Sequence, residues 1–323
     1  MILAGDIGGT KTNLAVFSAS GEEIRSAVYR SRDFSSLLPM VHDFLADEII
    51  TSACLGIAGP VLMNRVRTPN LAWEVDGDEV ARQAGLPMLV LVNDLVATAE
   101  GIPALEPGEL TDLNPGAEPA SGNAALIAPG TGLGMAIIDR GGGAWRSFPS
   151  EGGHQNFAPT NGEQMRLLEF LQREFTHVSI ERVVSGPGLG RIYRFLTETG
   201  EKHDDEAAAR IAAGDPAAEI VAAGLADSCP ACVRTLEVFL ACFGNAAANL
   251  ALVSLATGGL FIGGGMAPRL GAALDNGTFL KAFIAKGRLG RVLEKIPVRV
   301  IGNPRAAVLG AARCALRLLE AQP

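Results

Sequence analysis

The feature that most constrains this chain is a glycine turn near its start that has an echo in the middle of the sequence. The segment Gly9-Thr10-x-x-Asn13-Leu14-Ala15-Val16 aligns with Gly130-Thr131-x-x-Gly134-Met135-Ala136-Ile137. Each copy lies between two apolar runs, so each predicts a β-hairpin whose glycines let the backbone approach a ligand. Coincidence in a chain rich in Gly and Ala is the alternative reading.

Length and composition favour two lobes. A chain of 323 residues, 48% of them hydrophobic, is too long for one small core. The stretch from Glu106 to Asn123, rich in Pro, Gly and acidic residues, suits a connection over the surface. A helix predicted from Asn303 to Glu320 could cross back to the first lobe. We therefore expect a small lobe of residues 1–105 plus 303–323 and a large lobe of residues 106–302.

Apolar spacing predicts alternating strands and helices. Short continuous apolar runs bounded by polar residues or glycine indicate buried strands, and apolar residues at helical spacing indicate amphipathic helices. The expected strands are Ile2–Gly5, Asn13–Phe17, Glu23–Arg30, Ala53–Ile57, Met88–Val92 and Ala125–Ala128, and the expected early helices are Ser35–Ile49 and Asp76–Gln83.

Charge excludes some partners. A formal net charge of -8 and a pI near 5.2 argue against nucleic acid as a partner. The first residues lack the basic start and apolar core of a signal peptide, which predicts a cytoplasmic protein. No charged residue occurs between Val238 and Pro268, a length that could cross a bilayer. Polar residues and glycine clusters interrupt it, so we expect a buried helix followed by a buried strand and no membrane span.

The five cysteines give no disulfide framework. Cys229-Pro-Ala-Cys232 has the spacing of half a zinc site, but no second pair or Cys-His cluster completes four ligands. Two small buried side chains are the simpler interpretation, and a metal or redox role is the alternative.

The opening segment Gly5-Asp6-Ile7-Gly8-Gly9-Thr10-Lys11 carries the clearest chemistry. A glycine turn after a buried strand exposes backbone N–H groups that bind phosphate oxygens. The Asp6 carboxylate would repel those phosphates unless a divalent cation lay between them, which indicates a Mg²⁺ partner, through water. Thr10 offers a hydroxyl and Lys11 a cation to the same phosphates. A tight hairpin without a ligand is the alternative.

Other glycine motifs do not match the common nucleotide fingerprints. The run from Gly130 to Gly134 lacks the spacing of the dinucleotide motif, and no Lys follows it as in a P-loop. The run from Gly186 to Gly190 predicts a turn that leads into a helix.

Taken together and in order, these segments resemble the bacterial glucokinases of the actin-like ATPase and hexokinase superfamily. The resemblance covers nearly the whole chain, and the motifs that carry it are Gly5-Asp6-Ile7-Gly8-Gly9-Thr10, Val92-Asn93-Asp94, Gly130-Thr131-Gly132-Leu133-Gly134, Glu151-Gly152-Gly153-His154, Glu181-Arg182-Val183-Val184-Ser185-Gly186-Pro187-Gly188 and Gly263-Gly264-Gly265. It implies an α/β, two-lobed, ribonuclease H-like fold, with duplicated mixed sheets flanked by helices and a cleft between the lobes.

The resemblance also implies site residues. Asp94 would be the general base on the 6-hydroxyl of the sugar, although an N-cap of the helix that begins near Leu95 is the alternative role for this position. Sugar hydroxyls would be held by Asn93, Asp94, Glu151, His154 and Glu181. ATP would be held by Asp6, Ile7, Gly8, Gly9, Thr10, Lys11, Gly130, Thr131, Gly132, Gly263, Gly264 and Gly265. The other histidines, His42, His177 and His203, are expected to be structural.

The implied activity is transfer of the terminal phosphoryl group of ATP to glucose, giving glucose 6-phosphate and ADP for glycolysis, with Mg²⁺ as cofactor. The zinc motif of the related ROK sugar kinases is missing, so zinc is expected to be absent, and the family suggests a homodimer. Mannose, fructose or another hexose as acceptor, and ADP or polyphosphate as donor, stay open. A sugar-responsive regulator without turnover and an actin-like filament or chaperone ATPase are the alternatives from other classes.

Overall fold

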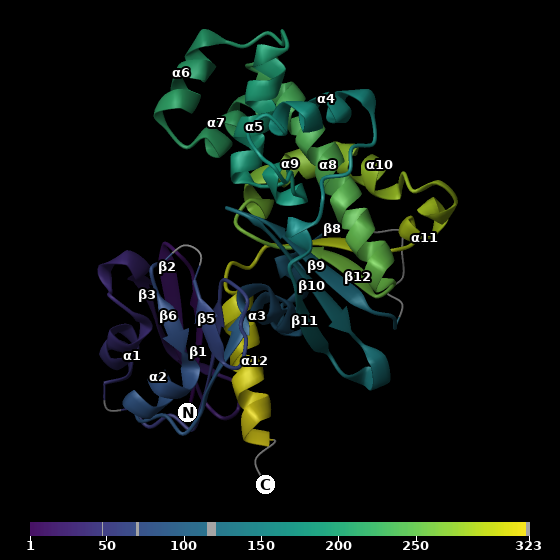
Figure 1. Ribbon diagram of the computed structural model, residues 1–323. Coiled ribbons are helices and arrows are strands. Elements are labelled where there is room, and N and C mark those ends of the chain that lie inside the picture. The colour runs from purple at the N-terminus through teal and green to yellow at the C-terminus, as the bar shows by residue number, and fades with distance from the viewer. Residues whose placement is uncertain (47, 69–70, 115–120, 321–323) are drawn as a thin grey trace. The chain divides into compact units, whose positions relative to one another are not determined.

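The computed structural model describes residues 1–46, 48–68, 71–114 and 121–320 and divides into two compact α/β units (Figure 1). The first unit comprises Met1–Glu109, Trp145–Pro149 and Asn303–Pro323, and the second comprises Leu110–Ala144 and Ser150–Gly302. The first and last parts of the chain thus belong to the same unit.

The sheet of the first unit has the strand order β3-β2-β1-β4-β7. The bounds are β1 Ile2–Ile7, β2 Lys11–Phe17, β3 Glu23–Arg30, β4 Ser52–Ile57 and β7 Leu89–Asn93. The pairs β1/β2 and β2/β3 are antiparallel, whereas β1/β4 and β4/β7 are parallel. The inner strand β4, between β1 and β7, is buried along its whole length, as its continuous apolar run requires.

Helices cover both faces of this sheet. One face packs against α1 (Leu37–Leu45), α2 (Gly77–Gln83) and the hairpin of β5 (Arg65–Arg67) and β6 (Glu74–Asp76) in one apolar cluster. The other face packs against α12 (Ala306–Glu320), whose small residues Ala311, Ala312 and Ala315 contact β1, β2 and β4. Figure 1 shows α12, in yellow, alongside β1 and α3 (Asp94–Gly101). Short 3₁₀ turns complete the unit at η1 Ser31–Asp33, η2 Ile102–Ala104 and η3 Pro107–Glu109.

Two glycines let α12 pack directly on α3. A Cβ at Gly310 would lie 1.7 Å from the carbonyl oxygen of Ala97, and one at Gly101 would lie 2.0 Å from that of Ala306. Backbone therefore meets backbone at this crossing, which no larger side chain would allow. The position of α3 consequently depends on α12.

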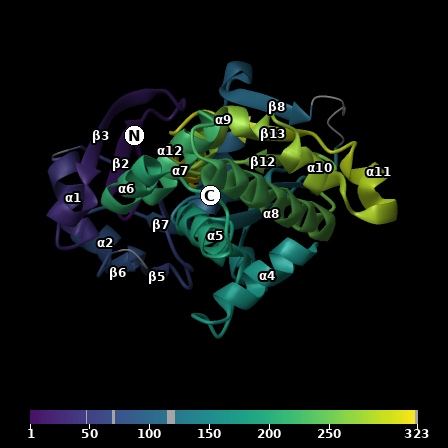
Figure 2. The same ribbon diagram turned by 90° about the horizontal axis from the view of Figure 1, so that it is seen from above.

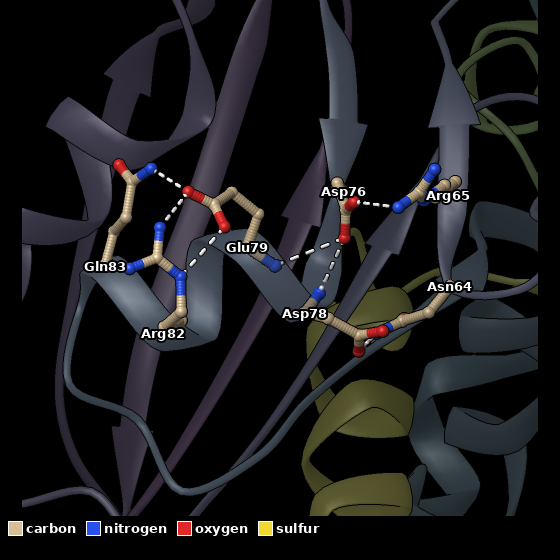
Figure 3. Close-up of polar contacts among 7 residues, drawn as sticks. All are labelled: Asn64, Arg65, Asp76, Asp78, Glu79, Arg82 and Gln83. Atoms are coloured by element: carbon tan, nitrogen blue, oxygen red, sulfur yellow. Dashed lines mark hydrogen bonds and ion pairs between the residues drawn. The ribbon is translucent and has the colours of Figure 1, made fainter.

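A polar network braces the last strand of this sheet (Figure 3). The side chain of Asp76 caps α2 by accepting from the N–H groups of Asp78 and Glu79, and it pairs with Arg65 at 2.7 Å. The Asn64 amide donates to Asp78 and to the carbonyl of Leu89, and its oxygen accepts from the N–H of Leu91. Asn64 thereby joins this network to β7, the strand that leads to Asp94.

The short segment Trp145–Pro149 also belongs to the first unit, and the buried side chain of Glu100 holds it there. Glu100 accepts the N–H of Ser147 at 2.9 Å and pairs with Arg317 at 2.6 Å. The indole of Trp145 donates to the carbonyl of Ala99. The chain changes units within β11 (Arg146–Ser150).

The second unit repeats the strand pattern of the first. Its sheet has the strand order β11-β10-β9-β12-β13-β8. The bounds not yet given are β8 Leu110–Asn114, β9 Ala124–Pro129, β10 Leu133–Asp139, β12 Gly259–Ile262 and β13 Val298–Ile301. The β9/β10 pair is antiparallel, and β9/β12 and β12/β13 are parallel, as in the series β2-β1-β4-β7. The two predicted glycine hairpins therefore occupy matching places in two sheets.

Helices of the second unit surround α8 (Pro230–Ser254), which contacts α5, α7 and α10 (Figure 2). The other bounds are α4 Gly162–Leu171, α5 Gly186–Glu198, α6 Asp205–Ala213, α7 Pro216–Leu225, α9 Ala267–Leu274, α10 Thr278–Ile284 and α11 Gly290–Leu293, with 3₁₀ turns at η4 Gly141–Gly143, η5 Gly152–His154, η6 Ile180–Arg182 and η7 Gly287–Leu289. Among the described helices, α8 alone is long and apolar enough to cross a membrane, and 72% of its most apolar window is buried inside the protein.

Several predictions of elements are confirmed and others are corrected. The charge-free stretch does form a buried helix and a buried strand, α8 and β12. The helix expected from Ser35 to Ile49 ends at Leu45, because Ala46 has a φ of 48° that the helix cannot continue. The connection expected from Glu106 to Asn123 contains a strand, β8, which pairs with β13; residues 115–120 of it lie outside the described residues.

The helix predicted after the run from Gly186 to Gly190 is confirmed as α5, but the run itself is not a turn. These glycines form the start of α5. The Ser185 hydroxyl accepts the N–H of Gly188, and Pro187 lies in the first turn of the helix. Ser before Pro is a strong helix start, and it overrides the low helix propensity of glycine here.

Candidate active site

The first glycine turn contains fewer residues than the sequence predicts. Asp6 and Ile7 belong to β1, and Lys11 begins β2, so only Gly8, Gly9 and Thr10 form the turn. The N–H of Gly8 donates to the Lys11 carbonyl at 3.0 Å, and the Ser31 hydroxyl donates to the Gly8 carbonyl at 2.6 Å. Within the described residues, the N–H groups of Gly9 and Thr10 have no hydrogen-bond acceptor. They are the donors that remain for a ligand.

Asp6 lies at the base of this turn. It pairs across the hairpin with Asn13, whose side chain hydrogen-bonds its carboxyl group. Burial, together with the negative charge of Asp94, raises the pKa of Asp6 to about 6. The two carboxyl groups are thus close enough for the charge of Asp94 to disfavour ionisation of Asp6.

Asp94 begins α3 directly after β7. Asn93 is the N-cap, and its side-chain oxygen accepts the N–H of Leu95 at 3.0 Å, a donor that the Asp94 carboxylate also shares. The alternative role of Asp94 as the N-cap is therefore wrong, because Asn93, one position earlier, is the N-cap. Gly56 on β4 leaves room for this arrangement, since a Cβ there would lie 2.7 Å from the Ala97 Cβ and 3.8 Å from the Asp94 Cα.

The Asn93 side chain already makes two hydrogen bonds within the protein. Its oxygen caps α3, and its amide nitrogen donates to the Gly59 carbonyl at 3.1 Å. One further amide hydrogen and one further lone pair remain for a substrate hydroxyl.

The second glycine turn, Gly130 to Gly132, holds a carboxylate against its backbone. The Glu181 Oε2 accepts the N–H of Leu133 at 2.9 Å, and a Cβ at Gly132 would lie 2.4 Å from that oxygen. The Gly130 N–H donates to the Gly132 carbonyl, and the Gly130 carbonyl accepts from Gly186. As in the first turn, the N–H groups of Thr131 and Gly132 have no acceptor in the described part of the chain.

The segment Glu151 to His154 forms a 3₁₀ turn that lies flat on β10. A Cβ at Gly153 would lie 2.0 Å from the Leu133 carbonyl oxygen, so this position requires glycine. One at Gly152 would lie 2.6 Å from the Met135 sulfur, and that side chain would have to shift. The His154 Nε2 is 3.8 Å from the Glu151 Oε2, and both side chains are 62% exposed. They are therefore accessible to a polar ligand.

The same segment is tied to η6, which carries Glu181. Ile180 N–H donates to the Gln155 carbonyl at 2.8 Å, and the His177 Nε2 is 2.9 Å from the His154 carbonyl oxygen. A cavity of about 280 Å³ opens beside these contacts and is lined by His154, Glu174, Phe175, Thr176, His177, Ser179, Glu181 and Arg182. His154 and Glu181 thus face one hollow of the second unit.

The third glycine cluster follows β12, as the sequence predicts. The N–H of Gly263 donates to the Ile127 carbonyl at 2.9 Å. Gly264 has a φ of 84°, and a Cβ there would lie 2.6 Å from the Pro129 carbonyl oxygen. Gly264 and Gly265 therefore lie beside the end of β9, where the second glycine turn begins.

The structure groups the expected residues by unit. Asp6 to Lys11, Asn93 and Asp94 lie at one end of the first sheet, and Glu151, His154, Glu181 and both later glycine clusters lie at the corresponding end of the second. Sequence reasoning missed Asn13, Ser31, Gly56 and His177. Asn13 was detectable, because a hairpin with this turn places it opposite Asp6.

The residues around Asp6 suit Mg²⁺. A buried carboxyl with a raised pKa and a second carboxyl nearby would both gain from a cation between them and a ligand. Among the described residues, no three His, Cys, Asp or Glu side chains gather as a metal cage. Magnesium needs no such cage, since it commonly keeps waters and binds one or two carboxylates together with phosphates.

Comparison with known proteins shows which family this chain is similar to. The family model described as Glucokinase matches residues 3–318. The chain is 39% identical to a glucokinase of Trichormus variabilis, with 98% of this chain and 99% of that protein covered. It is 38% identical to a glucokinase of Aromatoleum aromaticum, with 96% and 93% covered. The crystal structure of a glucokinase from an Antarctic psychrotroph superposes with a TM-score of 0.82 at 31% identity, over 98% of each chain.

Proposed function

The chain belongs to the glucokinase family, and on this premise we propose that Asp94 is the general base with which it transfers a phosphoryl group from ATP to the 6-hydroxyl of glucose. Family membership makes the chain an ATP-dependent hexose kinase of the actin-like ATPase fold. The roles of individual residues are the proposal.

The observation that supports Asp94 is its electrostatic coupling to Asp6. Asp94 begins a helix at the end of the parallel strand β7, beside the carboxyl group whose pKa its charge helps to raise. A base must be ionised and within reach of the proton it removes. A cation bound with the nucleotide near Asp6 would favour the ionised form of both carboxyl groups.

Glu151, His154 and Glu181 are proposed to bind the sugar hydroxyls, with Asn93 and Asp94. Glu151 and His154 are exposed on a rigid turn, and Glu181 is fixed by the Leu133 N–H so that one carboxylate oxygen remains for the ligand. A site that pairs each hydroxyl with a polar group rejects sugars that leave those groups unpaired.

The glycine turns are proposed to bind ATP. Backbone N–H groups of Gly9, Thr10, Thr131 and Gly132 have no acceptor among the described residues and suit phosphate oxygens, and Lys11 and Thr10 add a cation and a hydroxyl. The third cluster, Gly263 to Gly265, is proposed to lie against the adenosine. Mg²⁺ near Asp6 would neutralise phosphate charge, and the chain's own donors would hold the transferred group in line.

We further propose that the protein acts in the cytoplasm as a homodimer and supplies glucose 6-phosphate to glycolysis. These statements rest on membership of the glucokinase family.

The test replaces Asp94 by Asn and by Ala. We expect glucose 6-phosphate formation to fall by about 10²- to 10⁴-fold, the usual contribution of a general base, while nucleotide binding measured by calorimetry changes little. The control is Asp33→Asn, which changes an exposed carboxylate of the same unit. Near-normal turnover in both Asp94 variants would exclude the base role. A panel of glucose, mannose and fructose, run with the unmodified protein, measures the preference for the acceptor.

A further inference from the structure

Two cysteines of the first unit lie in one apolar cluster from different elements. Cys54 is fully buried in the middle of β4, and Cys314 is a partly exposed residue of α12 that packs on the same cluster. The Ser52 hydroxyl donates to the Ala315 carbonyl at 3.0 Å, which fixes α12 against this part of β4. The pair is therefore held by the fold and does not rely on a flexible loop.

The surroundings of Cys314 are those of a reactive thiol. The Arg317 guanidinium donates to its sulfur at 3.4 Å, and Arg317 is itself held by Glu100. The hydrogen bond from the Cys54 thiol, together with Arg317, lowers the pKa of Cys314 to about 7, and the same hydrogen bond and burial raise that of Cys54. By contrast, burial raises the pKa of Cys232 to about 12.

We propose that Cys314 is a site of oxidation by hydroperoxides and that Cys54 is the thiol that resolves it to an intramolecular disulfide. Three observations carry the proposal: the two cysteines share an apolar cluster, the Arg317 guanidinium contacts the sulfur of Cys314, and Cys314 is partly exposed. The proposal is independent of phosphoryl transfer.

The chemistry balances in two steps. The Cys314 thiolate attacks one oxygen of the peroxide, the O–O bond breaks, and a sulfenic acid and hydroxide form. The Cys54 sulfur then attacks the sulfenic sulfur, the S–S bond forms, and the departing hydroxide takes the Cys54 proton as water. Sulfur loses two electrons in total, and the peroxide gains them.

The position of the pair gives the bond a structural effect. Ser52, Cys54 and Gly56 point to the same face of β4, and Gly56 lies beneath Ala97 and Asp94. A disulfide would join α12 to β4 next to the helix that begins with Asp94.

The test treats the reduced full chain with hydrogen peroxide near neutral pH and measures intact mass and linked peptides. We expect a loss of two hydrogen atoms and a peptide that joins Cys54 to Cys314, both reversed by dithiothreitol. In Cys54→Ala, Cys314 should stop at the sulfenic acid, which dimedone traps. Cys242→Ser is the matched control, because Cys242 is buried in α8, and this variant should form the link as the unmodified chain does.

Absence of the Cys54 to Cys314 peptide, or earlier linkage of Cys229 to Cys232, would overturn the proposal. A second measurement does not depend on the variants. The rate at which iodoacetamide alkylates Cys314 should reach half its maximum near pH 7, and a midpoint near the ordinary thiol pKa would also contradict the proposal.

Discussion

The Glu181 side chain accepts a hydrogen bond of 2.9 Å from the backbone N–H of Leu133, and this bond joins two segments far apart in the sequence. A Cβ at position 132 would lie only 2.4 Å from the acceptor oxygen of Glu181. The glycine turn proposed for phosphate and the carboxylate proposed for sugar therefore constrain each other directly.

Gly132→Ala should uncouple them. The added methyl group would displace Glu181 or the turn, and we expect kcat/KM for glucose to fall by about 100-fold, the effect of a displacement of about 1 Å in an aligned site. Gly190→Ala is the control, since a Cβ there meets nothing within 4 Å. Equal activity of the two variants, with circular dichroism unchanged, would show that the close contact has no functional role.

Asp6 should make stability depend on pH. Its pKa in the folded protein is about 6, above the ordinary value of 3.8, so the folded state binds the proton more tightly than the unfolded state does. The stabilisation from this proton is complete below the unfolded pKa and is lost as pH rises through about 6. In the metal-free protein, ionised Asp6 should then cost about 3 kcal/mol above that pH.

Asp6→Asn removes this titration. Urea unfolding should show the variant gaining free energy of unfolding relative to the unmodified chain between about pH 4 and pH 6, the window set by the two pKa values. A constant difference across that window would contradict the raised pKa. Phosphoryl transfer by the variant should be lost, because the proposed Mg²⁺ partner is lost with it.

Gly310→Ala tests the crossing of α3 and α12. The new Cβ would lie 1.7 Å from the Ala97 carbonyl oxygen, and since the obstacle is backbone, the helices must separate. We expect a loss of about 1–3 kcal/mol in the free energy of unfolding, with reduced turnover because α3 carries Asp94. Gly108→Ala, where a Cβ has open space, is the control in the same unit. Matching thermal midpoints would mean that the crossing tolerates a larger residue.

The sequence predicted those parts of the molecule that depend on neighbouring residues. The hairpins around Gly8 and Gly130 follow from apolar runs and glycine, and the buried pair α8 and β12 follows from a charge-free stretch broken by glycines. The helix predicted after Gly186 to Gly190 is present as α5, but it begins at Gly186 because Ser185 and Pro187 start it before the glycine run ends. Strand β8 was missed because its partner, β13, lies almost at the other end of the second unit's sequence.

The same division applies to the site. The motifs predict Asp6 and Asp94 as site residues, but the effect of Asp94 on the pKa of Asp6 depends on β1 and β7 flanking β4 in the same sheet. The contacts of Glu181 with Leu133 and of His177 with His154 join segments that the sequence could not place together. The sequence thus predicts individual site residues, whereas the contacts that orient their side chains can be seen only in the structure.

The last helix has a consequence for how the protein is made. The cluster that closes one face of the first sheet combines Ile2, Ala4, Ala15, Phe17 and Cys54 with Val308, Ala311, Ala312 and Ala315. On the ribosome, the whole second unit emerges before these α12 residues do, so it can fold while the N-terminal sheet still lacks its cover. The earliest-made strands, including the one with Asp6, therefore wait longest for their native packing, and in that interval their apolar face is exposed to aggregation.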